Sequence, residues 1–379
     1  MLTDTHAPFN EDNTILSKLA RLNWPLIVLL FALAGIGALS LYSAGGGSIT
    51  PWAGKHLVRF FILLSGAIII SLINIRLWYR LTYPIYGIGL FLLIVVEITG
   101  HIGMGAQRWI NLGFIQIQPS ELMKIAVIMA LAKYFHAASR EDMARISFLI
   151  PPLIMIALPV ALVLIQPDLG TSVMIVVAGI AMFFIAGAPY WMFITGGAAV
   201  AASIPVLWMF LHDYQKKRVM TFLNPESDPF GSGYHISQSK IAIGSGGLEG
   251  KGFLKGSQSH LSFLPEKETD FIFTLWVEEW GFLGGLILLA INVAIILYGI
   301  WISFRCRHAF GQLLALGLII NYSLYVFINI AMVMGLIPVV GVPLPLVSYG
   351  GTAMLSVLIG FGLIMSASLH SDCKLPRMQ

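Results

Sequence analysis

Charged residues are scarce in this chain. Asp, Glu, Lys and Arg make up 11% of the 379 residues, whereas about a quarter of an ordinary soluble domain is charged. No carboxylate occurs between Asp12 and Glu97. Hydrophobic residues make up 58% of the chain and form stretches of roughly 20 residues, the length that crosses a hydrocarbon core about 30 Å thick. The scarcity of charge therefore excludes a soluble globular domain and indicates a membrane protein.

Strict alternation of apolar and polar residues, which marks the strands of a membrane barrel, is also missing. Only helices and closed barrels satisfy their backbone groups within lipid. The predicted fold is therefore an all-α polytopic integral membrane protein with about ten transmembrane helices. The expected spans are residues 24–44, 57–75, 78–98, 119–136, 146–166, 170–187, 189–211, 270–300, 309–335 and 346–370.

Cysteine is nearly absent, with only Cys306 and Cys373 in the sequence. Neither belongs to a Cys-x-x-Cys or Cys/His spacing, which excludes a disulfide framework and a zinc site of that kind. We expect both to be free thiols on a reducing face. The basic residues are scattered and form no run, so a nucleic-acid partner is not expected.

The basic residues do indicate an orientation. An even number of spans puts both termini on the same side, and Lys and Arg favour the cytoplasmic side of short segments. One set of short segments holds only Lys55, Arg59 and Arg108, whereas the other holds most of the remaining Lys and Arg residues near span ends. We therefore predict multi-pass insertion with both termini cytoplasmic. The expected parts are a tail at 1–23, a transmembrane domain at 24–370 and a tail at 371–379.

One large outer loop is expected at residues 212–269, between the seventh and eighth helices. It is rich in glycine, and we expect it to lack strong secondary structure and to be functional. Its cations, among them Arg218 and Lys240, are candidates for binding pyrophosphate or for a solvated basic face. The stretch IGSGGLEGKG lacks the strand and helix context of a phosphate loop, so no nucleotide site is assigned.

Glu121 and Lys124 are three residues apart on a helix that Pro119 begins, so they project from one face. Ionisable groups at membrane depth are costly and mark candidate functional sites. One interpretation is a buried ion pair that joins two helices. The other is that Lys124 binds an anionic head group while Glu121 holds it in place.

Asp168 stands in the first turn of a predicted span, where a carboxylate caps free N–H groups. Capping is the favoured interpretation from the residue alone. Arg108 stands beside Trp109, which favours an interfacial anchor over a phosphate contact.

Asp270 ends the long outer loop and begins a helix, where a membrane-bound substrate would present its head group. A helix N-terminus stabilises an ionised carboxylate, the form that a general base needs. The alternative is a plain N-cap. Glu278 and Glu279 lie about two turns deeper and cannot share one face with Asp270. We expect Glu278 to point to the interior, where it is a candidate for binding the substrate, and Glu279 to contact another helix.

Five segments occur in a fixed order along the chain: GAQRWINLG, QPSELMKIA, QPDLGTS, the stretch from NPESDPFGSGYHIS to LPEKETDFIF, and PVVGVPLPLVSYGGT. Together they resemble the SEDS family, named for shape, elongation, division and sporulation. The stretches HDYQKKRV and GSQSHLSFLPE look closer to the elongation, or rod-shape-determining, members than to the division members. The family usually reads EELG where this chain reads EEWG, so Trp280 replaces a leucine.

The resemblance implies a peptidoglycan glycosyltransferase of the bacterial inner membrane that polymerises lipid II during cell elongation. It also implies a class B penicillin-binding protein and other elongation-complex proteins as partners. The family's essential aspartate falls on Asp270, and the Glu and Lys of its central cavity fall on Glu121 and Lys124. The aspartate of QPDLGTS falls on Asp168, which favours a functional role more than the residue alone does.

A mechanism follows as an expectation. Asp270 takes the proton from the 4-hydroxyl of the acceptor GlcNAc, which attacks C1 of the donor MurNAc with inversion and displaces undecaprenyl pyrophosphate. Lys124, Arg218 and Lys240, or a divalent cation such as Mg²⁺ or Mn²⁺, would stabilise the leaving group. Asp270 is the candidate metal ligand.

Two other functions stay open. A lipid II flippase needs polar groups along a whole path through the membrane, whereas the carboxylates here cluster toward the outer side. A scaffold that only positions the penicillin-binding protein would lose no reaction on substitution of Asp270.

Overall fold

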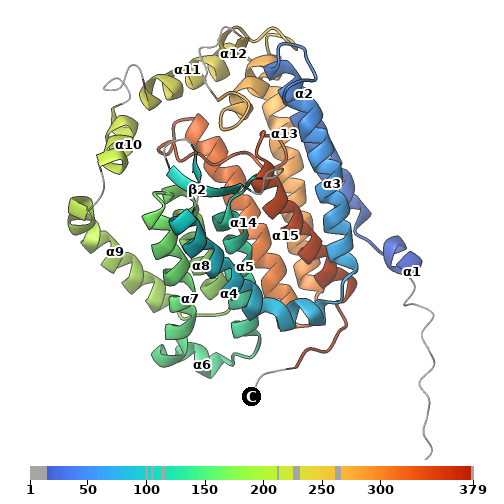
Figure 1. Cartoon of the computed structure of the whole chain (residues 1–379), viewed down its shortest axis with the longest axis vertical. Helices are drawn as coiled ribbons and strands as arrows, with labels where there is room; N and C mark the ends of the chain where they lie inside the picture. The colour runs from blue at the N-terminus through green and yellow to red at the C-terminus, as the bar shows by residue number, and fades with distance from the viewer. Residues whose placement is uncertain are drawn as a thin grey trace, which may run out of the picture.

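The computed structural model describes residues 15–99, 101–103, 106–111, 116–210, 213–224, 231–260 and 266–376. Long helices pack side by side in this part of the chain (Figure 1). The helical fold class is therefore confirmed. The helices are α1 (Ile15–Ala20), α2 (Trp24–Ala44), α3 (Ala53–Leu72), α4 (Ile75–Thr99), α5 (Pro119–His136), α6 (Arg140–Ala144), α7 (Ile146–Ile165), α8 (Leu169–Ile185), α9 (Tyr190–Phe210), α10 (Asp213–Leu223), α11 (Ser232–Ser245), α12 (Ser257–His260), α13 (Ile272–Arg305), α14 (Ala309–Val333) and α15 (Gly351–Leu369).

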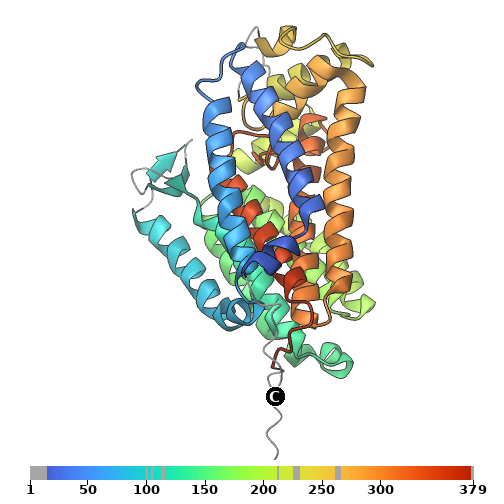
Figure 2. The ribbon, with the colours of Figure 1, turned by 90° about the vertical axis from the view of Figure 1, so that its right-hand side faces the viewer.

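A small antiparallel sheet, which the sequence did not predict, connects α4 to α5. Its strands are β1 (His101–Gly103), β2 (Ala106–Asn111) and β3 (Gln116–Ile117), in the order β1-β2-β3. Ile110 of β2 pairs with Ile117 of β3. The sheet lies at the end of α4, which leans away from α3 (Figure 2). It brings Arg108 of β2 to the same end of the molecule as the start of α8.

A helix lies at each of the ten predicted spans, with ends that differ by a few residues. Among the described residues, seven helices are long and apolar enough to cross a membrane: α2, α3, α4, α7, α13, α14 and α15. The helices α8 and α9 are apolar but contribute shorter stretches. The number of ten crossings therefore remains a prediction.

Local chemistry explains where several helices begin. A proline stands in the first turn of α2 and of α5, where its missing N–H costs no helical hydrogen bond. The Asp168 side chain accepts a hydrogen bond from the Thr171 N–H and caps α8. The His308 ring accepts one from the Gly311 N–H and caps α14.

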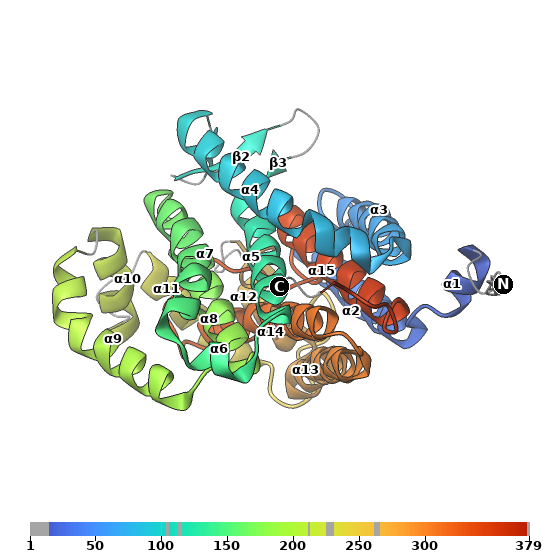
Figure 3. The same cartoon turned by 90° about the horizontal axis from the view of Figure 1, so that it is seen from below.

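The helix α5 lies at the centre of the bundle although it carries several polar side chains. It contacts α4, α7, α8, α14 and α15, and Figure 3 shows it between α7 and α15. Nearly all of its side chains are buried, including Ser120, Glu121 and Lys124. Its polar groups therefore face protein and not lipid, which is where ionisable groups at membrane depth are tolerated.

The outer loop contains helices, so the expectation of little secondary structure at 212–269 was wrong for its described residues. It holds α10, α11 and α12, and α11 packs against α13 and α14. Burial of Ile236 and Ala242 explains this docking, because both are almost fully enclosed. The helices α9, α10 and α11 form an arc at one side of the bundle (Figures 1 and 3).

Candidate active site

The backbone around Asp270 is held from two directions. The Nδ2 atom of Asn329, on α14, donates to the Asp270 carbonyl at 2.9 Å and to the Val342 carbonyl at 2.8 Å. The Ser348 hydroxyl donates to the Thr269 carbonyl at 2.6 Å. These contacts fix Asp270 between α14 and the segment that precedes α15, which keeps its side chain in a defined place.

The Asp270 carboxylate, unlike the backbone around it, is not held by hydrogen bonds among the described residues. Among the described residues it accepts no hydrogen bond and forms no ion pair, and it is half-buried. Its pKa is raised to about 7, chiefly by burial and also by the negative charge of Glu266, whereas Arg218 on α10 acts to lower it. A carboxyl with a pKa near neutrality is suited to proton transfer. Glu266 has φ +55°, an uncommon conformation that costs free energy and is often found at functional sites.

Asp270 is not the N-cap of α13. The cap position is held by Phe271, and no side chain bonds to the first free N–H groups of this helix. The interpretation of Asp270 as a plain helix cap was therefore wrong. This removes the main structural explanation for a carboxylate at this position.

Arg218 and Lys240, the two basic residues predicted to bind pyrophosphate, lie on different helices. Arg218 is half-buried on α10 and is close enough to Asp270 to affect its pKa. Lys240 is exposed on α11, and its side chain lies over Gly335, where a Cβ atom would collide with it. Pyrophosphate binding by these two residues stays a prediction.

Glu121 and Lys124 form a buried ion pair with an Nζ–Oε1 distance of 2.7 Å. The Tyr325 hydroxyl of α14 contacts both Glu121 and Lys124, and the Ser356 hydroxyl of α15 donates to Glu121 at 2.9 Å. We call these four residues the α5 polar cluster. It joins three helices, which confirms the ion-pair interpretation. Lys124 is only 2% exposed and is surrounded by protein, so binding of a head group stays a prediction for it.

Asp168 is buried and is used as a cap. Its carboxylate accepts from the Thr171 N–H at 3.2 Å, the Thr171 hydroxyl at 2.9 Å and Gln118 Nε2 at 2.9 Å. The prediction of capping is confirmed. Arg108 donates to the carbonyls of Gln166 and Pro167, just before Asp168. Its described hydrogen bonds therefore hold the chain that leads into α8, and a role in substrate binding stays a prediction.

Glu278 is fully buried and surrounded by donors from the outer loop. Its Oε1 atom accepts from Lys251 Nζ and the Gln258 N–H, both at 2.8 Å. Its Oε2 atom accepts from the Ser259 N–H at 3.1 Å and the Ser259 hydroxyl at 2.7 Å. The prediction of an interior residue is confirmed, but the described contacts of Glu278 attach the loop to α13. A role of Glu278 in substrate binding stays a prediction.

Glu279 contacts the Ser43 hydroxyl of α2, which confirms the prediction that it meets another helix. Two residues later the helical path is interrupted, because Gly281 has φ +67°. Only glycine adopts this conformation readily. The segment 247–252 packs into the interruption, with the Lys251 N–H donating to the Glu278 carbonyl at 3.0 Å.

Sequence reasoning missed three site residues: Tyr325, Ser356 and Asn329. Tyr325 and Ser356 complete the α5 polar cluster, and Asn329 holds the Asp270 backbone. A hydroxyl or an amide within an apolar span was the available signal, since such groups need partners in lipid. The sequence gives no indication of which partner each would have.

The donor set near Asp270 fits one kind of metal site. Among the described residues no group of three or more His, Cys, Asp and Glu side chains is placed to hold an ion. Mg²⁺ is commonly bound through one or two carboxylates together with substrate phosphates. Asp270 and Glu266, whose negative charges interact, fit that arrangement and not a cage made of protein ligands alone.

Comparisons with known proteins extend over almost the whole chain. A family model for cell cycle proteins of the FtsW/RodA/SpoVE type matches residues 23–373. The peptidoglycan glycosyltransferase MrdB of Escherichia coli (strain K12) is 44% identical over 346 residues, which cover 91% of this chain and 93% of that protein. Stage V sporulation protein E of Bacillus subtilis (strain 168) is 36% identical over 360 residues, which cover 91% and 96%.

Solved structures share the helical arrangement. One chain, from a structure described as "Structural coordination of polymerization and crosslinking by a peptidoglycan synthase complex", matches with a TM-score of 0.82 and 29% identity, over 93% of this chain and 98% of that chain. The rod shape determining protein RodA of Thermus thermophilus matches with a TM-score of 0.71 and 26% identity, over 93% and 99%. The similarity therefore includes both sequence and fold.

Proposed function

The chain belongs to the FtsW/RodA/SpoVE family of cell cycle proteins, and on this premise we propose that it is a peptidoglycan glycosyltransferase that polymerises lipid II during cell elongation. The name of the Escherichia coli relative and the description of the matching synthase complex support this activity. One structural observation supports the choice of Asp270 as the reacting group. Its backbone is held by α14 while its carboxylate has no hydrogen-bonding partner among the described residues and a pKa near neutrality.

In the proposed reaction Asp270 is the general base. Its carboxylate takes the proton of the acceptor 4-hydroxyl, and the oxygen attacks C1 of the donor sugar. The C1–O bond to undecaprenyl pyrophosphate breaks, and the leaving group carries away the electron pair. Direct displacement by one base gives inversion at C1. A second carboxylate acting as nucleophile is not part of the proposal.

Positive charge is needed where the pyrophosphate leaves. Arg218, which interacts electrostatically with Asp270, is the cation that the proposal assigns to this place, with Lys240 further along α11. A divalent cation, Mg²⁺ or Mn²⁺, is a further part of the proposal. When bound, it would offset the charge of the pyrophosphate; Asp270 would then be its ligand, with Glu266 beside it, in place of acting as the base. A role for Lys124, Glu121 and Asp168 would be to position the helices around the substrate.

The proposal also includes a location and a partner. The chain would cross the bacterial inner membrane ten times with both termini cytoplasmic, so that Asp270 faces the outer side, where lipid-linked sugars are polymerised. The matching synthase complex couples polymerization to crosslinking. This supports a class B penicillin-binding protein as the crosslinking partner, with other elongation proteins around it.

The test is polymerisation of lipid II by the purified protein with its cognate penicillin-binding protein, with transpeptidation blocked. We expect Asp270→Asn to form no glycan, because the amide cannot accept the proton, while the variant still folds and binds its partner. The matched control is Asp372→Asn, an exposed aspartate paired with Arg307. Its glycan yield should equal that of the wild type.

Unchanged glycan formation by Asp270→Asn would show that the base lies elsewhere. If neither wild type nor variant forms glycan in the complex, the flippase and the scaffold become the better explanations. Transport of labelled lipid II across vesicle membranes then separates these two, because only the flippase would move it.

A further inference from the structure

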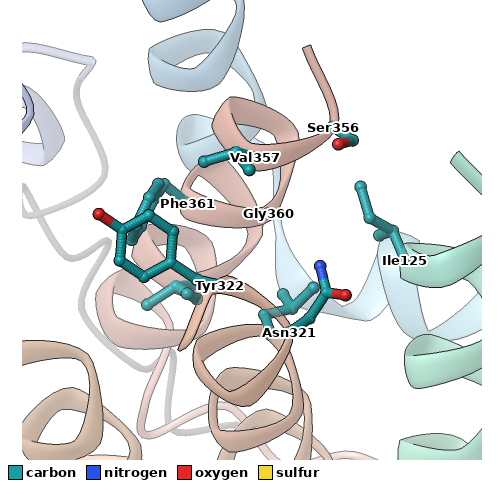
Figure 4. A pocket seen from close by; sticks show the side chains of 9 residues that line it. Ile125, Asn321, Tyr322, Ser356, Val357, Gly360 and Phe361 are labelled. Carbon is teal, nitrogen blue, oxygen red and sulfur yellow. The ribbon is translucent and has the colours of Figure 1, made fainter. Parts of the chain in front are cut away.

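An open hollow between α2 and α13 has the size of a ligand site. Its volume is about 500 Å³, within the range of about 300–1,000 Å³ that is usual for such sites. By contrast, the cavity lined by Ser356 and Asn321 (Figure 4) has only about 10 Å³, too little for an organic molecule. The two helices pack side by side (Figure 1). Ile36 of α2 and five residues of α13 line the hollow, together with Glu249 of the outer loop.

Two tryptophans of α13 belong to the wall of the hollow. The rings of Trp276 and Trp280 stack with their centroids 5.1 Å apart, and Trp276 Nε1 donates to the Gly284 carbonyl at 2.8 Å. A Cβ atom at position 284 would collide with Trp280, so the glycine permits this close approach. Trp280 is also the residue that replaces the usual leucine of the family. The wall is therefore held in place before a ligand binds, which lowers the cost of binding.

The hollow extends from the end of the helices toward the middle of the bundle. Glu249 belongs to the segment 247–252, which packs where the helical path of α13 is interrupted. At the same level Glu279 contacts Ser43, near the end of α2. Ile36 lies seven residues earlier on α2, about 10 Å deeper along the helix. One leaflet of a hydrocarbon core is about 15 Å deep, so the hollow fits within a single leaflet.

The shallow end of the hollow carries an uncompensated negative charge. Glu249 is the charged residue of the lining, it is exposed, and its carboxylate has no ion pair or hydrogen bond among the described residues. Lys251, the nearest basic residue along the chain, is ion-paired with Glu278 at 2.8 Å. The indole N–H of Trp280 also lacks an acceptor within the described part of the chain. This end therefore offers one negative charge and one hydrogen-bond donor above an apolar floor.

We propose that the hollow binds one acyl chain of a phospholipid whose head group carries a primary ammonium. The chain lies against the tryptophans and Leu283, the ammonium pairs with Glu249, and the Trp280 N–H donates to a phosphate or ester oxygen. A lipid with net negative charge is disfavoured because Glu249 repels its head group. A membrane-spanning helix of another protein is disfavoured because it needs contact across a core about 30 Å thick, far more than the depth of the hollow.

Retention of lipid by the full chain tests the choice of head group. The chain is placed in nanodiscs that contain equal amounts of phosphatidylethanolamine and phosphatidylglycerol with identical acyl chains. The lipids retained after transfer into detergent are counted by native mass spectrometry. We expect phosphatidylethanolamine to be retained about two- to fivefold more, the effect of one exposed ion pair.

Two matched variants assign this preference to the hollow. Glu249→Gln should abolish it. Glu141→Gln removes an exposed carboxylate from α6, at the opposite end of the bundle (Figure 1), and should leave it unchanged. No preference in the wild type, or an equal preference in Glu249→Gln, would overturn the proposal.

A cryo-EM map of the chain with its proposed partner in the same nanodiscs locates the lipid. We expect chain-shaped density between α2 and α13 that ends beside Glu249. Ile36→Trp should fill the hollow and remove the density, whereas Val28→Trp, at an exposed position on the same helix, should leave it. An empty hollow between well-resolved side chains, or a helix of the partner within it, would overturn the proposal. Only the naming of the outer leaflet rests on the proposed orientation, and the inference does not depend on the proposed reaction.

Discussion

The carboxylates of Glu121, in the α5 polar cluster, and of Asp270 have opposite surroundings. Glu121 has an ammonium group, a tyrosine hydroxyl and a serine hydroxyl around it, all buried. Asp270 has a fixed backbone but no hydrogen bond to its carboxylate within the described residues. A fully paired carboxylate stabilises the protein in its ionised form, whereas an unpaired one keeps its capacity to accept a proton. On the proposed function, the difference distinguishes a carboxylate that joins helices from a carboxylate that takes a proton.

The largest effect should come from pH. Because burial raises the pKa of Asp270 to about 7, the polymerisation rate should fall about tenfold per pH unit well below that value and reach a plateau above it. Arg218 lowers this pKa, so Arg218→Gln should move the midpoint to higher pH. The measurement is the initial rate of glycan formation as a function of pH. A midpoint near the ordinary value of an aspartate would contradict the role of burial.

The free energy of unfolding should change with pH in the opposite direction to the polymerisation rate. The folded state binds the Asp270 proton more tightly than the unfolded chain does, so this group stabilises the fold at low pH, and its contribution is lost as pH rises through about 7. Asp270→Asn should therefore unfold at the same or a higher temperature than the wild type under mildly alkaline conditions. A clear loss of stability there would mean that the carboxylate has a structural partner.

The second largest effect should come from breaking the ion pair between Glu121 and Lys124, which should lower the free energy of unfolding. Glu121→Gln leaves the Lys124 ammonium buried without a counter-charge, which costs roughly 3–5 kcal/mol in the free energy of unfolding. The double variant Glu121→Leu/Lys124→Met should be less destabilised than Glu121→Gln, since no charge remains buried. Thermal unfolding in detergent measures both. The exposed pair Arg307 and Asp372 is the control, and Asp372→Asn should change little.

Glu278 is a second carboxylate that is surrounded by donors, and its substitution should have a smaller effect. Glu278→Gln removes a charged acceptor and replaces one oxygen by an NH₂ group, so the donors on that side of the carboxylate lose their partner. We expect a loss of about 2 kcal/mol and faster hydrogen exchange in residues 251–259. Glu249→Gln, an exposed carboxylate in the same loop, is the control. Equal exchange in the two variants would show that Glu278 does not hold the loop.

The smallest effect should come from Asp168. Asp168→Ala removes the cap of α8 and the contact to Gln118, which should cost about 1–2 kcal/mol in thermal unfolding. Ser139→Ala removes an exposed cap at α6 and should cost less. If Asp168→Ala stays stable but loses glycan formation, Asp168 has a functional role beyond the cap.

Sequence patterns predicted what depends on neighbours along the chain. The apolar stretches located the helices, and the spacing of Glu121 and Lys124 predicted one shared face. The cap at Asp168 followed from its place before α8. Each of these depends on contacts within about one turn, which local sequence determines.

Contacts between distant segments were not predictable in the same way. The Tyr325 hydroxyl comes 204 residues after Glu121, and no spacing rule relates the two. The helices of the outer loop were missed because glycine predicts turns; for α11, the packing of the helix against α13 and α14 and the burial of Ile236 outweighed this preference. The failed N-cap interpretation of Asp270 has the same origin, since the bonds that fix it come from α14 and the segment before α15.

The interruption at Gly281 limits how the length of the chain can change. Several of the backbone groups freed there have partners in the loop, since the Phe282 and Leu283 N–H groups donate to the Gly247 and Leu248 carbonyls at 2.9 and 3.2 Å. An inserted residue between 247 and 252 would shift this pairing and leave these backbone groups without their present partners. Tags and fusion partners are therefore best placed elsewhere, and natural length variation in the outer loop should avoid these residues.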